Sequence, residues 1–424
     1  MSWNLETLLR ANASVDDYKI YSEQTQSYEL FFVHDKLETV RSTDTVETTV
    51  TVYVDHDDAR GDASFRIYAS TTEAEAERKI AEAAQKAGVV KNQPYTLPEN
   101  ETLDGAIASN LAEDTPVALA KQIADAVFAA DLYGQGSINA LEIFLRKHVV
   151  QVKNSRGIDK RETKYSAMVE AIPTWNAEES VELYECQNFN RFDAAKVTAE
   201  IERRMREVRD RSLAEIPTEK PKCTVVLDAP EVMVLLGDIV YDLGYATVYA
   251  GSNPFSVGDA VQKGPTGDLL TVTMRGAVEG SVESALFDAN GTTLVDTEVI
   301  RGGKVVDYFG SHRFAQYLGR KATGSLECCD VAAGTLTDAE LAEKPYFRCA
   351  SMSGLQVDVL NDYIGGEVRL AYYCANGESV PMTGISISGK LSDALASMRL
   401  ASERTAAGGG LVPKYAAFEG IEIV

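Results

Sequence analysis

Alternation of apolar and polar residues is the feature that most limits what this chain can fold into. In residues 46–54, the valines at positions 50, 52 and 54 are in phase, and residues 28–33 and 37–40 alternate in the same way. A period of two places successive side chains on opposite faces of a strand. The polar residues 34–36 and 55–61 predict turns between the runs, and residues 64–68 predict a further strand. The chain therefore opens with an antiparallel sheet.

Helix signals interrupt this pattern at three places. Each candidate begins with a residue whose side chain can accept a bond from the free amides of the first turn, and each continues with apolar residues three or four positions apart. The expected helices begin after Thr72, which forms a capping box with Glu75 and stops at Gly88; after Thr115, with Pro116 in its first turn and an end near Gly134; and after Asp193.

A second set of strands separates the last two helices. Residues 140–145 and 149–152 alternate, residues 154–157 read Asn-Ser-Arg-Gly, and another apolar run follows at 165–169. Asn and Gly favour tight turns because both tolerate left-handed backbone conformations. We expect a long hairpin here.

The chain changes character after Pro217, where the polar run 218–222 ends the third helix. At 424 residues the protein is too long for one compact core. We predict an α+β protein with a mixed strand and helix domain at 1–217 and a mainly antiparallel β domain at 218–424. The strands expected in the second domain are 269–274, 281–287, 293–300, 305–308, 367–373 and 385–388. One helix at 392–400 and a turn at 408–410 complete it.

Composition excludes several classes of function. The formal net charge is −23 and no segment concentrates Lys and Arg, so direct nucleic-acid binding is disfavoured. No apolar run is long enough to span a membrane, and no secretion signal is recognisable, so we expect a cytoplasmic protein. The cysteines lack metal or redox spacing and are expected to be reduced and mostly buried. They are Cys186, Cys223, Cys328, Cys329, Cys349 and Cys374.

No catalytic motif is visible in the sequence. The histidines, His34, His56, His148 and His312, are far apart, so no pair has the spacing of a helical zinc motif. There is no nucleophile elbow and no phosphate loop. The acidic stretch 55–58 lacks the ligand pattern of a calcium loop and reads as a solvated turn. His312 with Cys328 and Cys329 is the one grouping that could support a relocated hydrolytic site, although free cysteines are more often inert core residues.

Several stretches resemble the TldD/PmbA family, which includes metallopeptidases and proteins described as modulators of DNA gyrase. The opening strands at 28–40 and 50–55 resemble the start of the family pattern, and residues 154–157 resemble its N-S-x-G turn. Residues 308–319 and 322–324 resemble its D-R-x-T-A-x-x-L-G and T-G elements, with His312 and Arg313 at the D-R position. Residues 385–395 resemble its I-x-I-x-G-x-L-x-D passage. The order of these elements along the chain carries the resemblance.

The resemblance also identifies what is missing. In the family's catalytic TldD subunits, a strand like residues 223–228 leads into an H-E-x-x-x-H helix that binds zinc. Here Gly237 and Asp242 occupy the approximate histidine positions, and Asp238 occupies that of the glutamate. Glycine offers no ligand, and two carboxylates hold zinc poorly without imidazole. The resemblance implies a scaffold helix, with no catalytic or metal-binding residue in this chain.

This departure is similar to the TldE/PmbA branch, which implies a non-catalytic subunit that pairs with a TldD-like zinc peptidase and acts on unfolded peptides. Zinc would be held by the partner, and this chain would bind no cofactor. His312 and Arg313 could face the substrate or the partner, or they could instead stabilise a local turn. A homodimer is expected to be possible when the partner is absent. The alternatives are a self-standing peptidase with a relocated site and a regulatory protein of the gyrase-modulator type.

Overall fold

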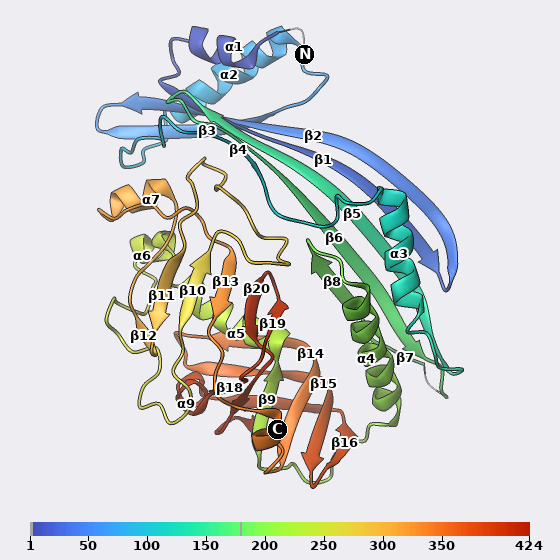
Figure 1. The fold of residues 1–424 in the computed structure, drawn as a ribbon. Helices are drawn as coiled ribbons and strands as arrows, with labels where there is room; N and C mark the ends of the chain where they lie inside the picture. The colour runs from blue at the N-terminus through green and yellow to red at the C-terminus, as the bar shows by residue number, and fades with distance from the viewer. Residues whose placement is uncertain (1–2, 179) are drawn as a thin grey trace.

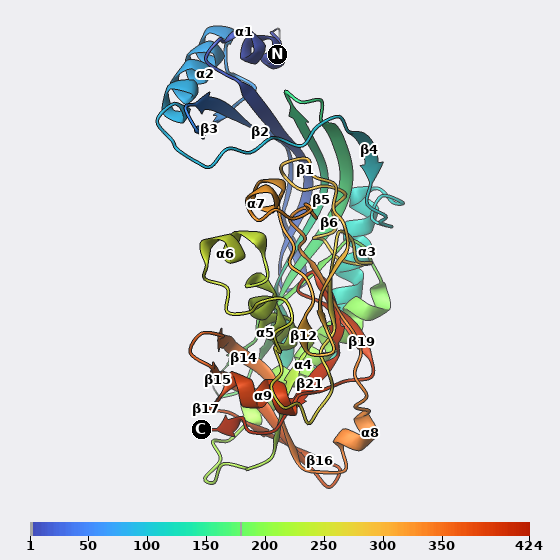
Figure 2. The same ribbon diagram turned by 90° about the vertical axis from the view of Figure 1, so that its left-hand side faces the viewer.

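The computed structural model describes residues 3–178 and 180–424. Figure 1 shows a long, curved sheet from the N-terminal half of the chain, which arches beside a more compact body formed by the C-terminal half. Figure 2 shows helices α5, α6 and α7 along one side of that body. The fold is α+β with mainly antiparallel sheets, as the alternation pattern predicts.

The N-terminal sheet has the order β3-β2-β1-β5-β6-β4, with β7 and β8 pairing β6. Its neighbours are antiparallel except β4 and β6, which run parallel. The strands are β1 (Asp17–Val33), β2 (Lys36–His56), β3 (Ala59–Ile67), β4 (Thr102–Ala106), β5 (Gly136–Asn154), β6 (Asp159–Trp175), β7 (Val181–Glu182) and β8 (Glu185–Phe189). The predicted hairpins are confirmed, but β1, β2, β5 and β6 are much longer than their alternating cores.

Four helices accompany this sheet: α1 (Leu5–Ala11), α2 (Glu73–Ala87), α3 (Pro116–Phe128) and α4 (Ala194–Leu213). The predicted caps are confirmed, because the side chains of Thr72, Thr115 and Asp193 each accept an amide of the first turn. Helix α3 ends at Phe128, earlier than Gly134. Helices α3 and α4 pack on one face of the sheet, where alternate residues of β1, β5 and β6 are buried.

The C-terminal half forms two further sheets. The six-stranded sheet has the order β12-β11-β10-β13-β20-β19, and the eight-stranded sheet has the order β18-β21-β9-β14-β15-β17-β22, with β16 pairing β15. The strands are β9 (Thr224–Asp228), β10 (Val272–Arg275), β11 (Thr297–Arg301), β12 (Lys304–Val305), β13 (Cys328–Val331), β14 (Tyr346–Asp358), β15 (Tyr363–Ala375), β16 (Glu378–Met382), β17 (Ile385–Gly389), β18 (Arg399–Leu400), β19 (Arg404–Ala407), β20 (Gly410–Pro413), β21 (Tyr415–Phe418) and β22 (Glu422–Ile423).

Helix α5 (Ala229–Tyr241) lies in the main core of this half, where it packs on β14 and β20. The shorter helices are α6 (Tyr245–Ala250), α7 (His312–Tyr317), α8 (Asp338–Leu341) and α9 (Leu391–Ser397). Helix α9 ends at Ser397, three residues before the predicted end, because Arg399 and Leu400 pair with β21. Residues 408–409 form the turn between β19 and β20, both with positive φ, in agreement with the predicted turn.

The strand predicted at 281–287 is wrong. Its backbone amides are used elsewhere: Ser281 donates to the Val278 carbonyl, Ala285 to the Gly276 carbonyl and Leu286 to the Glu162 carboxylate on β6. The segment is instead a loop that docks on the N-terminal sheet, where Leu286 and Phe287 pack against Val150. The apolar residues that alternate in this segment are therefore explained by packing against the N-terminal half, and not by pairing within a sheet.

The helices within residues 3–178 and 180–424 are all either too short or too polar to cross a membrane.

Candidate functional site

The degenerate zinc motif lies on the C-terminal half of α5. The helix buries Val232, Leu235 and Ile239 on its inner side, which fixes its position in the core. Gly237 lies on another side, where an added Cβ would meet no atom within 4 Å. Helix α5 is therefore held in the core by its apolar side, while Gly237 faces open space.

The remaining side chains of the motif do not fit zinc. Partial burial raises the pKa of Asp238, and burial followed by the charge of Asp238 raises the pKa of Asp242. Both shifts disfavour the ionised carboxylate that a metal ligand needs. In the described ranges, no three His, Cys, Asp or Glu side chains converge as a metal site would require. One exposed and one partly buried carboxylate are a poor donor set for zinc.

Gly237 leads to a first prediction. Glycine in a helix interior costs about 0.5–1 kcal/mol relative to alanine, and an added methyl meets no neighbour here. Gly237→Ala should therefore raise the free energy of unfolding by about 0.5–1 kcal/mol, as measured by denaturant titration. Gly334→Ala is the matched control, because its Cβ would lie 2.2 Å from the Leu400 carbonyl oxygen and must destabilise. A destabilised Gly237→Ala variant would contradict the open environment.

The second predicted site begins helix α7, and its two residues differ in environment. Arg313 lies over the rings of Tyr95 and Tyr317, 5.0 and 5.5 Å from their centroids. It donates to the Tyr317 hydroxyl at 3.1 Å and lies 3.8 Å from Asp62. Tyr95 and Asp62 belong to the N-terminal half, so Arg313 is part of the junction between the halves.

His312 has a different setting. Burial lowers the pKa of His312, and the charges of Asp288 and Glu99 oppose that effect. The imidazole is therefore biased towards its neutral form. Among the described residues its ring makes no side-chain hydrogen bond. The backbone links the segment before this helix to the start of α6, which follows α5 directly, because the Tyr245 amide donates to the Phe309 carbonyl at 2.7 Å. The structure thus brings the two predicted sites to neighbouring segments.

The junction continues through the loop that follows α2. The Thr96 amide and hydroxyl donate to the Gln316 side-chain oxygen, whose amide donates back to the Thr96 carbonyl at 2.9 Å. Tyr317 donates to the Gln93 carbonyl at 2.5 Å. Helix α7 is therefore attached to residues 92–97 by several hydrogen bonds in addition to the aromatic contacts.

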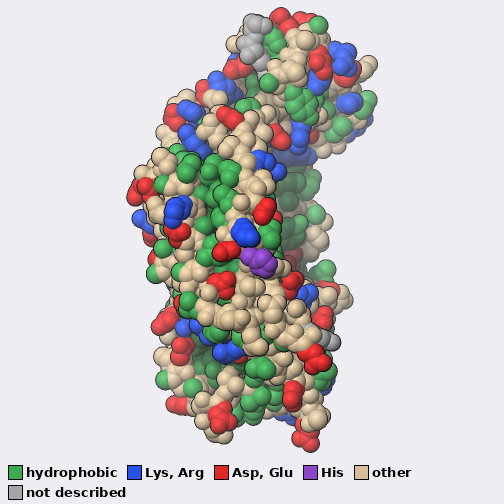
Figure 3. Space-filling model, turned by 90° about the vertical axis from the view of Figure 1, so that its right-hand side faces the viewer, with side chains coloured by type: hydrophobic (Ala, Val, Ile, Leu, Met, Phe, Trp, Pro, Cys, Tyr) green, Lys and Arg blue, Asp and Glu red, His purple; other side chains and the backbone are tan. Residues whose placement is uncertain are grey.

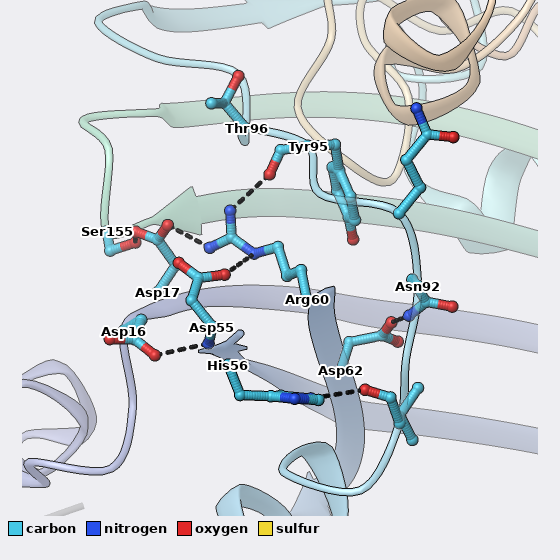
Figure 4. Close-up of polar contacts among 12 residues, drawn as sticks. Asp16, Asp17, Asp55, His56, Arg60, Asp62, Asn92, Tyr95, Thr96 and Ser155 are labelled. Carbon is cyan, nitrogen blue, oxygen red and sulfur yellow. Dashed lines mark hydrogen bonds and ion pairs between the residues drawn. The ribbon is translucent and has the colours of Figure 1, made fainter. Parts of the chain in front are cut away.

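A buried ion network holds that loop to the sheet (Figure 4). Arg60 bridges Asp17 and the Tyr95 carbonyl, and its Nε lies 3.3 Å from Asp55. Arg156 donates to both Asp17 oxygens, and Ser155 donates to one of them. Burial raises the pKa of Asp17, but the bonds from Arg156, Ser155 and Arg60 outweigh it and hold the pKa below 3.8. The stretch 55–58, predicted to be a solvated turn, includes one participant, Asp55.

The N-terminal sheet carries a polar face that the sequence did not reveal. Strand register places Glu142 opposite Glu170, and His148 Nδ1 lies 2.9 Å from Glu23. These residues alternate with those that α3 and α4 cover, so they lie on the opposite face of the sheet. Burial and then Glu170 raise the pKa of Glu142. Alternation indicated a polar face, but only the register shows which of its residues are neighbours.

Two cavities of about 440 and 260 Å³ lie where α4 meets the C-terminal sheet. Arg203 lines both, and Arg348 in the larger one pairs with Asp228 at 2.8 Å. Burial, followed by the charge of Asp228, raises the pKa of Glu231 to about 7. Glu231 lies in the first turn of α5 and lines the smaller cavity. A carboxyl there is close to half protonated at neutral pH.

Glu231 leads to a second prediction. Its pKa is about 7 in the folded chain and 4.5 in the reference state, so the folded state binds more protons between these values and stability falls as pH rises through that window. Glu231→Gln should therefore stabilise the protein at pH 8 by roughly 1–3 kcal/mol, and the gain should disappear below pH 4.5. Urea titrations at the two pH values measure this. A gain that is independent of pH would rule out titration of Glu231 as its cause.

The thiols proposed for a relocated site are buried. Burial raises the pKa of Cys328, and it raises the pKa of Cys329 to about 12. Cys328 Sγ lies 3.5 Å from the Ser281 hydroxyl, and within the described part of the chain it makes no hydrogen bond with His312. Thiolates, and not thiols, are the nucleophiles. The grouping therefore lacks the setting of an activated cysteine.

Residues 220–424 match the PmbA/TldA metallopeptidase C-terminal domain. A comparison with curated protein sequences finds no match. Three solved structures share the fold over 99% of this chain: TldE from Thermococcus kodakarensis (TM-score 0.82, 15% identity, 99% of that chain), and proposed DNA gyrase modulators from Thermotoga maritima (0.78, 14%, 98%) and Bacteroides thetaiotaomicron (0.77, 15%, 96%).

At such low identity the structural matches establish the fold, and the sequence match over the C-terminal half establishes the relationship. Strands β9 to β22 and helices α5 to α9 all fall within the matched residues. Residues 220–424 belong to the TldD/PmbA family, and the whole chain shares the fold of TldE.

Proposed function

We propose that this chain is a cytoplasmic, non-catalytic subunit of the TldE/PmbA type, which pairs with a zinc-binding, TldD-like peptidase subunit that acts on unfolded peptides. One observation carries the proposal. Helix α5 is retained and packed, while Gly237 and Asp242 replace the two histidines that the family resemblance expects. The fold shared with TldE from Thermococcus kodakarensis supports the same branch.

The polar face of the N-terminal sheet suggests how such a subunit would contribute. Glu29 pairs with Arg41 there, and Glu142, Glu170 and His148 lie on the same face. Half-buried groups of both signs can bind the backbone and side chains of an extended peptide without performing chemistry. In this proposal the chain holds substrate, and the partner cleaves it.

The test measures zinc content and cleavage of an unfolded peptide for the chain alone, for a TldD-like subunit alone and for the co-expressed pair. We expect zinc and activity to follow the TldD-like subunit, with activity highest in the pair. Asp238→Ala/Asp242→Ala in this chain is the matched variant, and the pair should keep its zinc and activity. Stoichiometric zinc and cleavage by this chain alone would overturn the proposal. So would failure of the two subunits to associate.

A further inference from the structure

A serine, a histidine and a glutamate lie in a row across three neighbouring strands of the N-terminal sheet. Strand β5 runs between β1 and β6, as Figure 1 shows. His148 lies on β5, with Glu23 on β1 and Ser166 on β6. His148 Nδ1 lies 2.9 Å from the Glu23 carboxylate, and His148 Nε2 lies 3.2 Å from the Ser166 hydroxyl. The imidazole therefore connects a hydroxyl to a carboxylate.

These contacts determine which ring nitrogen carries the proton. The bond from His148 lowers the pKa of Glu23, so this side chain is ionised at neutral pH and can only accept hydrogen bonds. His148 Nδ1 is therefore the donor, and in the neutral ring Nε2 is left to accept the proton of Ser166. Serine hydrolases use the same order of contacts, in which the carboxylate orients the imidazole and the imidazole activates the serine.

Further contacts hold the three residues in place and leave them accessible. The Tyr21 hydroxyl donates to the second Glu23 oxygen at 3.2 Å, and the Thr25 hydroxyl lies 3.2 Å from His148 Nδ1. The side chains of His148 and Glu23 are 17% and 32% exposed, and Ser166 is half-buried. All of them lie on the polar face of the sheet, opposite to the face that α3 and α4 cover. The arrangement is thus ordered, and a small substrate can reach it.

Two basic residues flank Ser166 on the same face. Strand register places Arg146 directly opposite Ser166 and Lys164 directly opposite His148. The chain has a net charge of −23, and Figure 3 shows basic side chains interspersed with acidic ones on one side of the molecule. The two basic neighbours therefore give Ser166 a more positive setting than the average surface of the chain. Positive charge beside the hydroxyl stabilises the oxyanion that forms when an acyl carbon is attacked.

We propose that Ser166 is a nucleophile that hydrolyses carboxylic esters, with His148 as its general base and acid and Glu23 as a positioning residue. Ser166 Oγ attacks the acyl carbon while its proton moves to His148 Nε2. The bond to the ester oxygen breaks, and the leaving alcohol takes the proton from Nε2. Water then attacks the acyl-serine and gives a proton to Nε2. The carboxylic acid is released, and the proton returns from Nε2 to Ser166 Oγ.

This reaction goes beyond the proposed function, which assigns the cleavage of peptides to zinc in the partner. It uses residues of the N-terminal sheet of this chain, and its proton transfers involve no metal. Esters are the expected substrates because an alcohol oxygen is a better leaving group than the nitrogen of a peptide bond.

Labelling of the isolated full chain tests the nucleophile. A fluorophosphonate, which activated serines retain as a stable adduct, is added together with a metal chelator, and peptide mass spectrometry locates the adduct. Turnover of p-nitrophenyl acetate is followed by absorbance under the same conditions. We expect the adduct on Ser166, and turnover on the order of 100-fold slower in Ser166→Ala.

Ser22→Ala is the matched control for this test. Ser22 lies in the same sheet, but its hydroxyl contacts Thr48 at 3.1 Å in place of a histidine, so the control should turn over the ester at the parent rate. Circular dichroism verifies that each variant is folded. A parent protein without an adduct on Ser166, or equal turnover by Ser166→Ala and Ser22→Ala, would overturn the proposal.

The other two members test the proton transfer. His148→Gln should lower kcat by a similar factor, and Ser166→Ala/His148→Gln should lose no more activity than either single variant, because the two residues act as a unit. Glu23→Gln should lower kcat by at least about 10-fold with KM unchanged, since the imidazole is no longer held in the required tautomer. Additive losses in the double variant, or an unchanged kcat in Glu23→Gln, would contradict the proposed roles. These measurements use the chain alone, so their result does not depend on whether a TldD-like subunit binds it.

Discussion

Replacing Arg60 by alanine is expected to lower the free energy of unfolding by about 3 kcal/mol. Asp17 and Arg60 are each 3% exposed, and removal of one member of a buried ion pair typically costs 3–5 kcal/mol. Arg156 still contacts Asp17 in the variant, so the lower end of that range applies. The substitution also removes the donor to the Tyr95 carbonyl, so it should loosen the loop that contacts α7.

Urea titration followed by circular dichroism measures this effect. Lys121→Ala is the control: its pair with Asp125 is exposed and should contribute less than about 0.5 kcal/mol. Because the folded pKa of Asp17 lies below its reference value of 3.8, its stabilising contribution is present above that value and is lost as pH falls further. The difference between parent and Arg60→Ala should therefore shrink in acid. Equal losses for Arg60→Ala and Lys121→Ala would show that the network contributes nothing.

Phe347→Ala should destabilise the C-terminal half by about 3–5 kcal/mol. Phe347 is fully buried on β14, between β9 and β15, in the cluster that also holds α5. Truncation to alanine removes the buried ring and leaves a cavity that the surrounding strands close only partly. Because α5 rests on this cluster, the degenerate motif should lose its fixed position as well.

Phe347→Leu is the control, and it should cost less than about 1.5 kcal/mol because it keeps most of the volume. Tryptophan fluorescence of Trp3 and Trp175, both in the N-terminal half, can be compared with circular dichroism of the whole chain. If the halves unfold together, the two signals should move to lower urea in parallel. A Phe347→Ala midpoint equal to that of Phe347→Leu would contradict the assigned packing.

The sequence was sufficient to predict an element wherever contacts between residues close in the chain determine the structure. Thr72, Thr115 and Asp193 specify helix starts because a cap is a contact within four residues. The sequence was insufficient where contacts with distant segments of the chain determine the local structure. The loop at 281–287 alternates like a strand, but Glu162 on β6 takes the Leu286 amide. Helix α1 was missed because its seven residues carry little periodicity.

The same distinction applies to the candidate site. The absence of histidine from α5 could be predicted, because the family resemblance aligns Gly237 and Asp242 with a known motif. The role of Arg313 could not, since its partners Tyr95 and Asp62 lie more than two hundred residues earlier in the chain. Glu142 and Glu170 become neighbours only through strand register.

The loop that docks on the N-terminal sheet has a consequence for the order of folding on the ribosome. Lys160 is fully buried, and it bonds Thr293 at 2.6 Å as well as Glu101. Val150, Val152 and Ile158 are covered in part by Phe287. Until residues 281–293 have been synthesised, the first half of the chain exposes the apolar patch formed by Val150, Val152 and Ile158. Lys160, beside this patch, then lacks its hydrogen bond to Thr293. The nascent first half should therefore need a chaperone, and a truncated gene product should aggregate.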